Sequence, residues 1–217
     1  MNTVLLHPAY FGPVSQYAVI AQYEKIVFEN FDSYQKQTYR NRMYIYDANG
    51  KLLLNIPVKH KSSLTGKESD GHQLYKEVLI DNSFEWQKQH WRALKASYQT
   101  SPFFEFYEDD IVHLYEQQFA HLMDFNYQCQ AFVFDALGIE PEIKQSEEYF
   151  RNPKEMDNGR HLISAKKDFN FSATPYQQVF EPKHGFINNL SILDLIFNLG
   201  PQSLEFLENQ KLPDFNF

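Results

Sequence analysis

The first 29 residues decide the fold, and residues 3–29 read TVLLHPAYFGPVSQYAVIAQYEKIVFE. Residues 4–6 and 26–28 are short apolar runs of β-strand length, and the residues between them place Tyr17, Ala18 and Ala21 at helical spacing. Because strand, helix and strand follow one another so closely, the stretch is typical of a parallel crossover. The sequence therefore predicts an α/β fold.

A β-hairpin is predicted further along the chain. Residues 42–46 and 52–58 are β-prone runs on either side of Asp47-Ala48-Asn49-Gly50, in which the Asn-Gly pair tolerates positive φ. We expect a single domain over residues 1–217, with a small, mostly parallel or mixed sheet near the N-terminus, a β-hairpin and flanking helices. An α+β arrangement is the alternative if the hairpin dominates the sheet.

Helical periodicity follows the hairpin. Three helices are expected between residues 82 and 138 and a fourth over residues 192–199, whereas residues 140–182 are weakly patterned and fit short strands or long ordered loops. The first helix is expected to start at Asn82, with Glu85 as its capping partner, and the second at Ser101-Pro102. The third is expected to end at Gly138, and the fourth to start at Ser191 and end at Gly200.

Composition restricts the class of protein. The formal net charge of −8 and a pI near 5.5 argue against a nucleic-acid binder, which needs a basic face over many phosphate contacts. Cys129 is the only cysteine, so no intrachain disulfide forms. Neither a secretory signal nor an apolar run of about 20 residues is evident, so we expect a cytoplasmic protein without a transmembrane segment.

One stretch opposes the charge of the rest of the chain. Residues 33–67 contain seven cations and a single acid, Asp47, within a chain whose net charge is −8. Such a cluster raises the free energy of the folded state unless an anionic ligand or a neighbouring acidic surface offsets it. The stretch is therefore either a ligand site or an internal contact, and the sequence leaves both open.

Candidate catalytic residues follow the two N-terminal strands. In open α/β sheets, ligands gather beyond the carboxyl ends of the strands, where His7 and Tyr10 follow the first strand and Glu29 ends the second. His7 and Glu29 could form an oriented acid/base pair. The alternatives are that His7 binds a turn carbonyl and that Glu29 pairs with Arg40 or Arg42.

Candidate binding residues lie around the hairpin. Asn41 and Arg42 open it and Lys59 follows its second strand, so these side chains could hold a phosphate or carboxylate at one end. Their alternative is a solvated basic face. His90, on the flank of an expected helix, is either structural or part of the substrate site. Residues 62–72 are polar with two glycines and read as a mobile lid. No metal site is predicted, and no cofactor is indicated.

Several short motifs together resemble one family. They are His7-Pro8-Ala9-Tyr10-Phe11-Gly12-Pro13, Phe28-Glu29-Asn30, Tyr39-Arg40-Asn41-Arg42, Ile56-Pro57-Val58-Lys59, and Tyr98 with Ser101-Pro102-Phe103-Phe104. The chain resembles the WbqC-like protein family, and its ending, with Tyr176-Gln177-Gln178-Val179-Phe180 and Asn189-Leu190-Ser191, resembles the version common in Bacteroidetes. Where other members often begin the first motif with Gln-Pro, this chain has His7-Pro8. Tyr10, Asn41, Arg42 and Lys59 match the pattern better.

The resemblance implies a pathway. The family is named from an O-antigen gene cluster, which implies a role in making or modifying the amino sugars of surface polysaccharide. We expect an enzyme that transfers an acyl or aminoacyl group to an amino sugar nucleotide, with an anionic small molecule as partner: a nucleotide sugar, an acyl-coenzyme A or a phosphopantetheine carrier. The alternative is a non-enzymatic binding or scaffold protein that docks an acidic partner such as a carrier protein.

Overall fold

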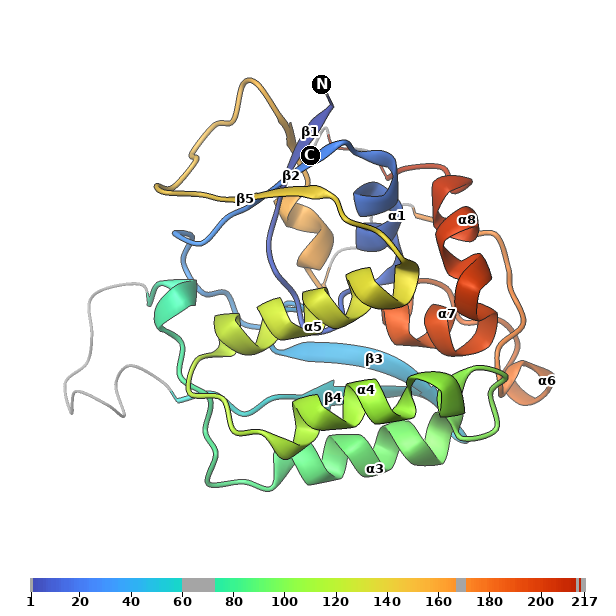
Figure 1. The fold of residues 1–217 in the computed structure, drawn as a ribbon. Helices are drawn as coiled ribbons and strands as arrows, with labels where there is room; N and C mark the ends of the chain where they lie inside the picture. Colours follow the sequence, from blue (N-terminus) through green and yellow to red (C-terminus); the bar gives the residue numbers. More distant parts are fainter. Residues whose placement is uncertain (1, 60–72, 167–170, 214, 216–217) are drawn as a thin grey trace.

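A computed structural model describes residues 2–59, 73–166, 171–213 and 215. Its main sheet has four parallel strands in the order β5-β2-β1-β6 (Figure 1). The strands are β1 (Thr3–Leu6), β2 (Lys25–Phe28), β5 (Glu142–Gln145) and β6 (Asp157–Asn158). The predicted crossover is confirmed, since helix α1 (Val14–Gln22) joins β1 to β2 and the two strands pair in parallel from Thr3 with Lys25 to Leu6 with Phe28.

The hairpin forms a second, separate sheet. Strands β3 (Arg42–Asp47) and β4 (Gly50–Asn55) pair antiparallel, with Arg42 opposite Asn55 at the open end. Gly50 has a φ of +106° at the turn, which a residue without a Cβ adopts at no steric cost. The mixed α/β class is therefore confirmed, with most pairings parallel.

Helices flank both sheets. Figure 1 shows α3 and α4 lying side by side next to the hairpin, and α5 between that pair and the main sheet. The elements are α3 (Trp86–Tyr98), α4 (Phe104–Glu116), α5 (Leu122–Leu137), α6 (Glu181–His184), α7 (Ile192–Leu199) and α8 (Ser203–Glu208), with single turns η1 (Tyr75–Glu77), η2 (Arg160–Ile163) and η3 (Gly200–Gln202). Where the structure describes the chain, no helix combines the length and apolar character that a bilayer crossing requires.

The predicted helix boundaries at Gly138, Ser191 and Gly200 are confirmed, and two predicted starts are wrong. Helix α5 ends at Gly138 in the left-handed conformation, and Ser191 Oγ accepts a hydrogen bond from Leu193 N at the start of α7. Helix α3 begins at Trp86 rather than Asn82, because Asn82 Oδ1, the atom that would cap a helix, accepts a hydrogen bond from the Trp86 indole N–H instead of a backbone N–H. Helix α4 begins after Ser101-Pro102, since the Ser101 hydroxyl donates to Tyr98 O.

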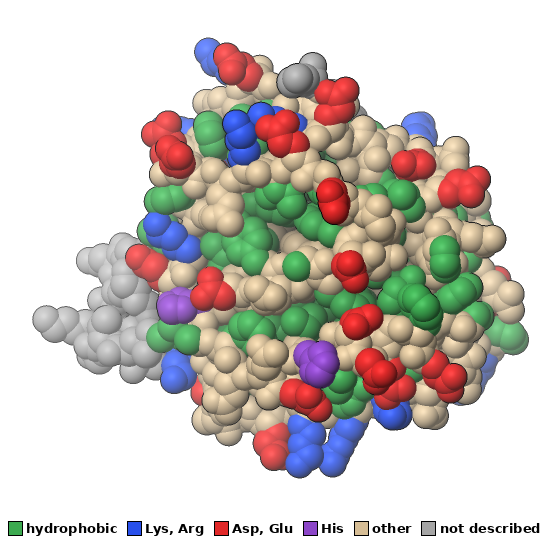
Figure 2. Space-filling model, in the orientation of Figure 1, with side chains coloured by type: hydrophobic (Ala, Val, Ile, Leu, Met, Phe, Trp, Pro, Cys, Tyr) green, Lys and Arg blue, Asp and Glu red, His purple; other side chains and the backbone are tan. Residues whose placement is uncertain are grey.

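The core is largely aromatic, as the composition indicates. Tyrosine and phenylalanine rings from all parts of the chain are fully buried in one cluster. They include Tyr10, Tyr17, Tyr75, Tyr98, Phe11, Phe28, Phe104, Phe125 and Phe197. On the face shown in Figure 2, acidic side chains are spread over the surface and lysines and arginines lie mainly around its margin.

Candidate functional site

The four parallel strands end at one edge of the main sheet and bring polar side chains together there. His7 follows β1 and Glu29 follows β2, as expected from the sequence. Ser146 follows β5, and Arg160 comes two residues after β6. The Ser146 hydroxyl donates to Glu29 Oε1 at 2.8 Å, so neighbouring strand ends are in direct contact.

A hollow of about 210 Å³ opens at this edge. We call it the edge hollow, and its lining residues are His7, Asp32, Gln35, Thr38, Arg40, Arg160, His161, Ile163 and Ser164. Arg40 and His7 are almost completely buried, whereas Asp32 keeps 15% of its side chain exposed. Asp32 is thus the acid of this group that an incoming molecule reaches first.

Three ionisable side chains form the floor of the edge hollow. Arg40 Nη2 lies 2.8 Å from His7 Nε2 and 3.2 Å from Asp32 Oδ2, and His7 Nε2 lies 3.0 Å from the same carboxylate oxygen. Burial raises the pKa of Asp32, but its attraction to Arg40 and the Ser33 backbone N–H that donates to the carboxylate outweigh that effect, and the net pKa is lowered. Asp32 is therefore ionised and Arg40 charged at neutral pH.

His7 is neutral in this arrangement. Burial and the nearby Arg40 charge lower its pKa to about 4, against the opposing influence of Asp32. Its Nδ1 lies 3.2 Å from the Glu29 carbonyl oxygen and donates to it, so the lone pair is on Nε2 and accepts from Arg40. His7 is thus fixed in one tautomer, with its acceptor nitrogen toward Asp32 and Arg40.

Glu29 forms neither the expected acid/base pair with His7 nor the alternative ion pair with Arg40 or Arg42. Its carboxylate is completely buried and accepts hydrogen bonds from Phe31 N, Ser146 Oγ and Phe150 N. Its ion pair is with Arg160, whose Nη1 lies 3.5 Å from Oε2, and not with Arg40 or Arg42. His7 contacts the carbonyl of Glu29, and the carboxylate beside His7 is that of Asp32.

A second hollow of about 300 Å³ lies at the open end of the hairpin. We call it the basic hollow, and it is lined by Tyr34, Lys36, Gln37, Asn41, Arg42, Asn55 and Val58. None of these seven residues carries a carboxylate, so Lys36 and Arg42 give the hollow a positive charge.

Two polar atoms of the basic hollow are buried without a partner among the described residues. They are Arg42 Nε and Asn41 Oδ1. The Asn41 amide nitrogen is occupied, since it donates to Ile56 O at 2.9 Å and to Asn55 Oδ1 at 3.2 Å. An unsatisfied buried group costs free energy, and both atoms are enclosed by protein, so a ligand reaches them only after a local rearrangement of the hollow.

The chain between residues 34 and 42 separates the two hollows. Gln35, Thr38 and Arg40 line the edge hollow, whereas Asn41 and Arg42 line the basic one. Burial raises the pKa of Tyr34 to about 12, although Arg40 and Arg42 both act in the opposite direction, which places this phenol near both guanidinium groups. The two hollows are therefore neighbours on either side of one segment.

Lys59 lies beyond the lining of the basic hollow. Its backbone N–H donates to Leu79 O, and its side chain is exposed. Val58 is the residue of this segment that reaches the hollow. The expected lid at residues 62–72 lies outside the described residues.

Tyr10 and His90 lie together in the aromatic core, away from the linings of both hollows. The Tyr10 hydroxyl is 2.8 Å from His90 Nδ1 and 2.9 Å from the Tyr115 hydroxyl. Burial lowers the pKa of His90 to about 4, against a hydrogen bond to the backbone of Asn55, whose side chain lines the basic hollow. His90 therefore contacts the backbone of one residue that lines the basic hollow.

Sequence reasoning missed Asp32, Ser146 and Arg160. The last two come from the weakly patterned region, where β5 has four exposed residues and β6 has two residues, so neither strand has an apolar run to reveal it. Asp32 follows Glu29 by three residues, and its position beyond a predicted strand end was the available signal. Among the described residues, no three His, Cys, Asp or Glu side chains gather as a metal-binding group.

Comparison with known proteins places the chain in a family. The model of the WbqC-like protein family matches residues 8–170. The chain belongs to this family. The matched range includes every lining residue of the two hollows except His7. Membership of the WbqC-like family suggests a role related to polysaccharide biosynthesis.

The chain is also similar to a mycobacterial protein. It is 26% identical over 215 residues to the uncharacterized protein Rv1507c of Mycobacterium tuberculosis, and the match covers 85% of this chain and 87% of the relative. No solved structure gives a significant match.

Proposed function

We propose that this WbqC-like protein is an enzyme of surface-polysaccharide (O-antigen) biosynthesis that transfers an acyl or aminoacyl group to an amino sugar nucleotide. The observation that carries the proposal is the adjacency of two hollows with different chemistry. The basic hollow offers Arg42 and Lys36 to an anion, and the edge hollow offers Asp32 and His7 to a proton. A transferase acting on a nucleotide sugar needs both functions close together.

The basic hollow would hold the diphosphate. Arg42 can bind two phosphate oxygens through its forked Nη groups, while Lys36 adds a point charge. Lys59, which is close in sequence to the lining residue Val58, would add positive charge at the rim.

The edge hollow would hold the amine and the acyl group. The amine nitrogen forms a bond to the acyl carbon, the bond from that carbon to its carrier breaks, and the nitrogen gives its proton to Asp32 or to His7 Nε2. Arg40 positions both acceptors, since it contacts each of them. Glu29 acts through Arg160 as a positioning residue, because its own carboxylate oxygens are occupied by buried donors.

Binding of uridine diphosphate tests the anion site. Arg42→Ala should weaken its affinity by about 1.5–3 kcal/mol, the value of a charge-assisted contact, while unfolding free energy changes by about 0–1 kcal/mol. Isothermal titration and chemical denaturation of the same variant give the two numbers. Arg92→Ala, on the exposed side of α3, is the matched control and should change neither. A large loss of stability with unchanged affinity would make Arg42 part of the scaffold.

Turnover tests the edge hollow. Wild-type protein is incubated with uridine-diphosphate amino sugars and a panel of acyl-coenzyme A species, and amide products are sought by mass spectrometry. Asp32→Asn should lower the rate by about 100-fold or more, the usual contribution of a positioned base, and leave diphosphate affinity within about twofold. If no diphosphate binds and an acidic carrier protein does, the basic hollow docks a partner and the scaffold alternative replaces the enzyme.

A further inference from the structure

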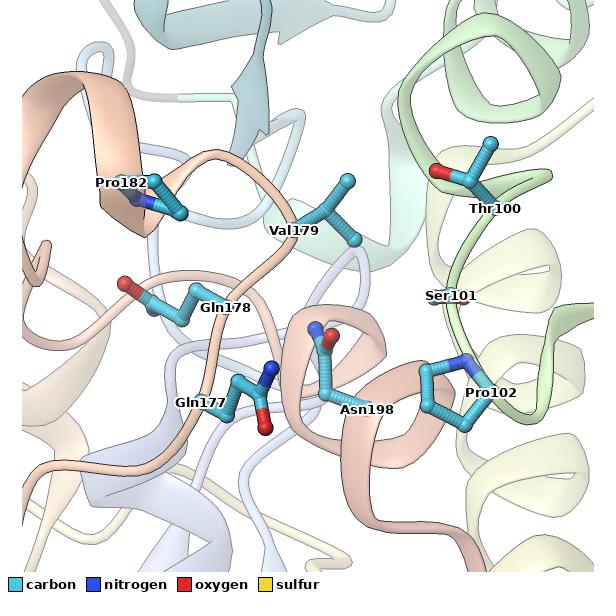
Figure 3. Close-up of a pocket in the computed structure, with 8 residues that line it drawn as sticks. All are labelled: Thr100, Ser101, Pro102, Gln177, Gln178, Val179, Pro182 and Asn198. Atoms are coloured by element: carbon cyan, nitrogen blue, oxygen red, sulfur yellow. The ribbon is translucent and has the colours of Figure 1, made fainter.

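A third hollow lies apart from the two described above, and its lining contains no charged side chain. It has a volume of about 230 Å³ and is drawn in Figure 3. We call it the neutral hollow, and it is lined by Thr100, Ser101, Pro102, Gln177, Gln178, Val179, Pro182 and Asn198. Five of these eight residues lie beyond the range that the family model matches.

The polar groups of the neutral hollow are amides and hydroxyls. Figure 3 shows the side-chain amide of Gln177 directed toward Asn198, with the Asn198 amide between the 177–179 segment and the turn at residues 100–102. Asn198 Nδ2 donates to Asp194 O, which leaves the side-chain oxygen for a ligand. Gln177 is exposed, so its amide can both donate and accept.

The wall of the hollow is rigid. Gln178 turns away from the opening and its amide donates to Asp194 Oδ2 at 2.8 Å and to Ile187 O at 3.0 Å, while its Oε1 accepts from Ile187 N at 2.8 Å. The buried Asp194 carboxylate also accepts from Tyr176 and Tyr98. These bonds fix the 177–179 segment against α7, so a ligand meets a surface that needs little ordering.

The lining selects against charge. A charged ligand entering this hollow would lose water without gaining an opposite charge, because none of the eight lining residues carries one. Glu181, next to Pro182, points its Oε2 at the backbone N–H of Gln178. Pro102, Val179 and Pro182 add apolar surface, so the hollow combines hydrogen-bonding groups with patches that accept C–H groups.

We propose that the neutral hollow binds one uncharged sugar unit, with Gln177 and Asn198 hydrogen-bonding its hydroxyl groups and Pro102 and Val179 packing against its C–H surface. Sugar hydroxyls donate and accept, as the amides do, while the ring carbons present the apolar surface that the proline and valine match. A volume of about 230 Å³ is below the roughly 300–1,000 Å³ of sites for drug-sized ligands, which suits a single ring. Binding here requires neither the anion nor the acyl transfer proposed above.

Saturation-transfer NMR with single sugars tests this assignment. Glucose, galactose, mannose and N-acetylglucosamine are compared with glucuronate and glucosamine, which carry a negative and a positive charge, and with glycerol. At least one neutral sugar should receive saturation, and glucuronate, glucosamine and glycerol should not. Gln177→Ala should weaken the sugar's affinity at least tenfold. Gln99→Ala is the matched control, because Gln99 is an exposed glutamine beside Thr100 that does not line the hollow.

A second variant keeps the test independent of folding. Gln177→Glu conserves the shape of the side chain and adds a carboxylate, so it should weaken neutral-sugar binding and admit glucosamine, with a thermal midpoint equal to that of the wild type. Absence of saturation for every neutral sugar overturns the proposal, as does a signal that both Gln177 variants leave unchanged. A preference of the wild type for glucuronate, or equal binding of glycerol, would also overturn it. Uridine diphosphate binding, measured in parallel, reports on the basic hollow separately.

Discussion

Two buried histidines occupy opposite kinds of environment in this protein. His7 is 1% exposed and His90 is 5% exposed, and burial is the first cause that lowers the pKa of each to about 4. His7 lies among Asp32 and Arg40 at the edge of the parallel sheet. His90 lies between the neutral rings of Tyr10 and Trp86, with centroid distances of 5.8 and 5.3 Å.

The difference lies in what surrounds each ring. Around His7, a carboxylate and a guanidinium border a hollow, so a proton or an anion that enters changes the local balance of charge. Around His90, phenol and indole groups fill the space, and the imidazole packs in the core with a hydrogen bond to the Tyr10 hydroxyl. Burial lowers the pKa of both histidines, so the pKa alone does not distinguish the candidate site from the core, whereas the charged neighbours and the hollow do.

The largest effect should come from removing the charge beside His7. Arg40→Met keeps most of the side-chain volume but leaves Asp32 without its buried cation, which should cost about 3–5 kcal/mol of unfolding free energy. Urea denaturation measures this loss. Arg92→Met, an exposed substitution of the same kind, should change stability by less than about 0.5 kcal/mol. Equal values for the two variants would mean that the His7 cluster contributes nothing to the fold.

Acidification should reveal the contribution of His90 to stability. His90 has a folded pKa of about 4 and an unfolded value of about 6.5, so the unfolded state binds its proton first and stability falls as the pH drops from 6.5 to 4. His90→Gln removes this contribution. The unfolding free energy of the wild type minus that of the variant should therefore fall by at most about 3 kcal/mol as the pH drops from 6.5 to 4.

The difference between wild type and variant is measured because other groups titrate nearby. Burial raises the pKa of Asp194, which makes the folded state bind a proton more readily above pH 3.8 and opposes the histidine effect. Asp194 is present in both proteins, so its contribution cancels in the difference between their unfolding free energies. Denaturation curves that stay parallel from pH 7 to 4 would show that His90 titrates alike in the folded and unfolded states.

The smallest effect should distinguish two tyrosines. Tyr10→Phe removes the hydroxyl that contacts His90 and Tyr115, which should cost about 0.5–1.5 kcal/mol and leave the affinity for uridine diphosphate unchanged. Tyr34→Phe, in the lining of the basic hollow, should lower the affinity for uridine diphosphate and leave the unfolding free energy unchanged. A drop in affinity for Tyr10→Phe at constant stability would place Tyr10 in the binding site.

The sequence predicted the elements that carry their own pattern. The β1-α1-β2 crossover, the hairpin and the end of α5 each combine a periodic apolar run with a turn residue, and each was found. Residues 140–182 lack such a pattern, because Glu142–Gln145 is exposed at the sheet edge and β6 contributes only two pairs. Their strand pairing depends on tertiary contacts that no local periodicity records.

The candidate site also has residues that the sequence could place and partners that it could not. His7 and Glu29 could be placed at one edge of the main sheet from the sequence, because each follows a predicted parallel strand, and Arg42 could be placed at the start of the hairpin. Asp32 and Arg160 could not be assigned as their partners, because that pairing depends on how two distant loops meet. Arg160 reaches Glu29 across more of the chain than any sequence pattern spans.

The pairing of β1 with β6 sets the order in which the protein can be assembled. Val4 pairs with Asp157 and Leu5 with Asn158, so the sheet closes only after nearly the whole intervening chain has been synthesised. A nascent chain that ends before Arg160 has no cation to place beside the buried Glu29 carboxylate, and burying that charge alone is unfavourable. The edge hollow is therefore formed late, and ribosome-bound chains stalled ahead of residue 160 should be cleaved by proteases much faster than released protein.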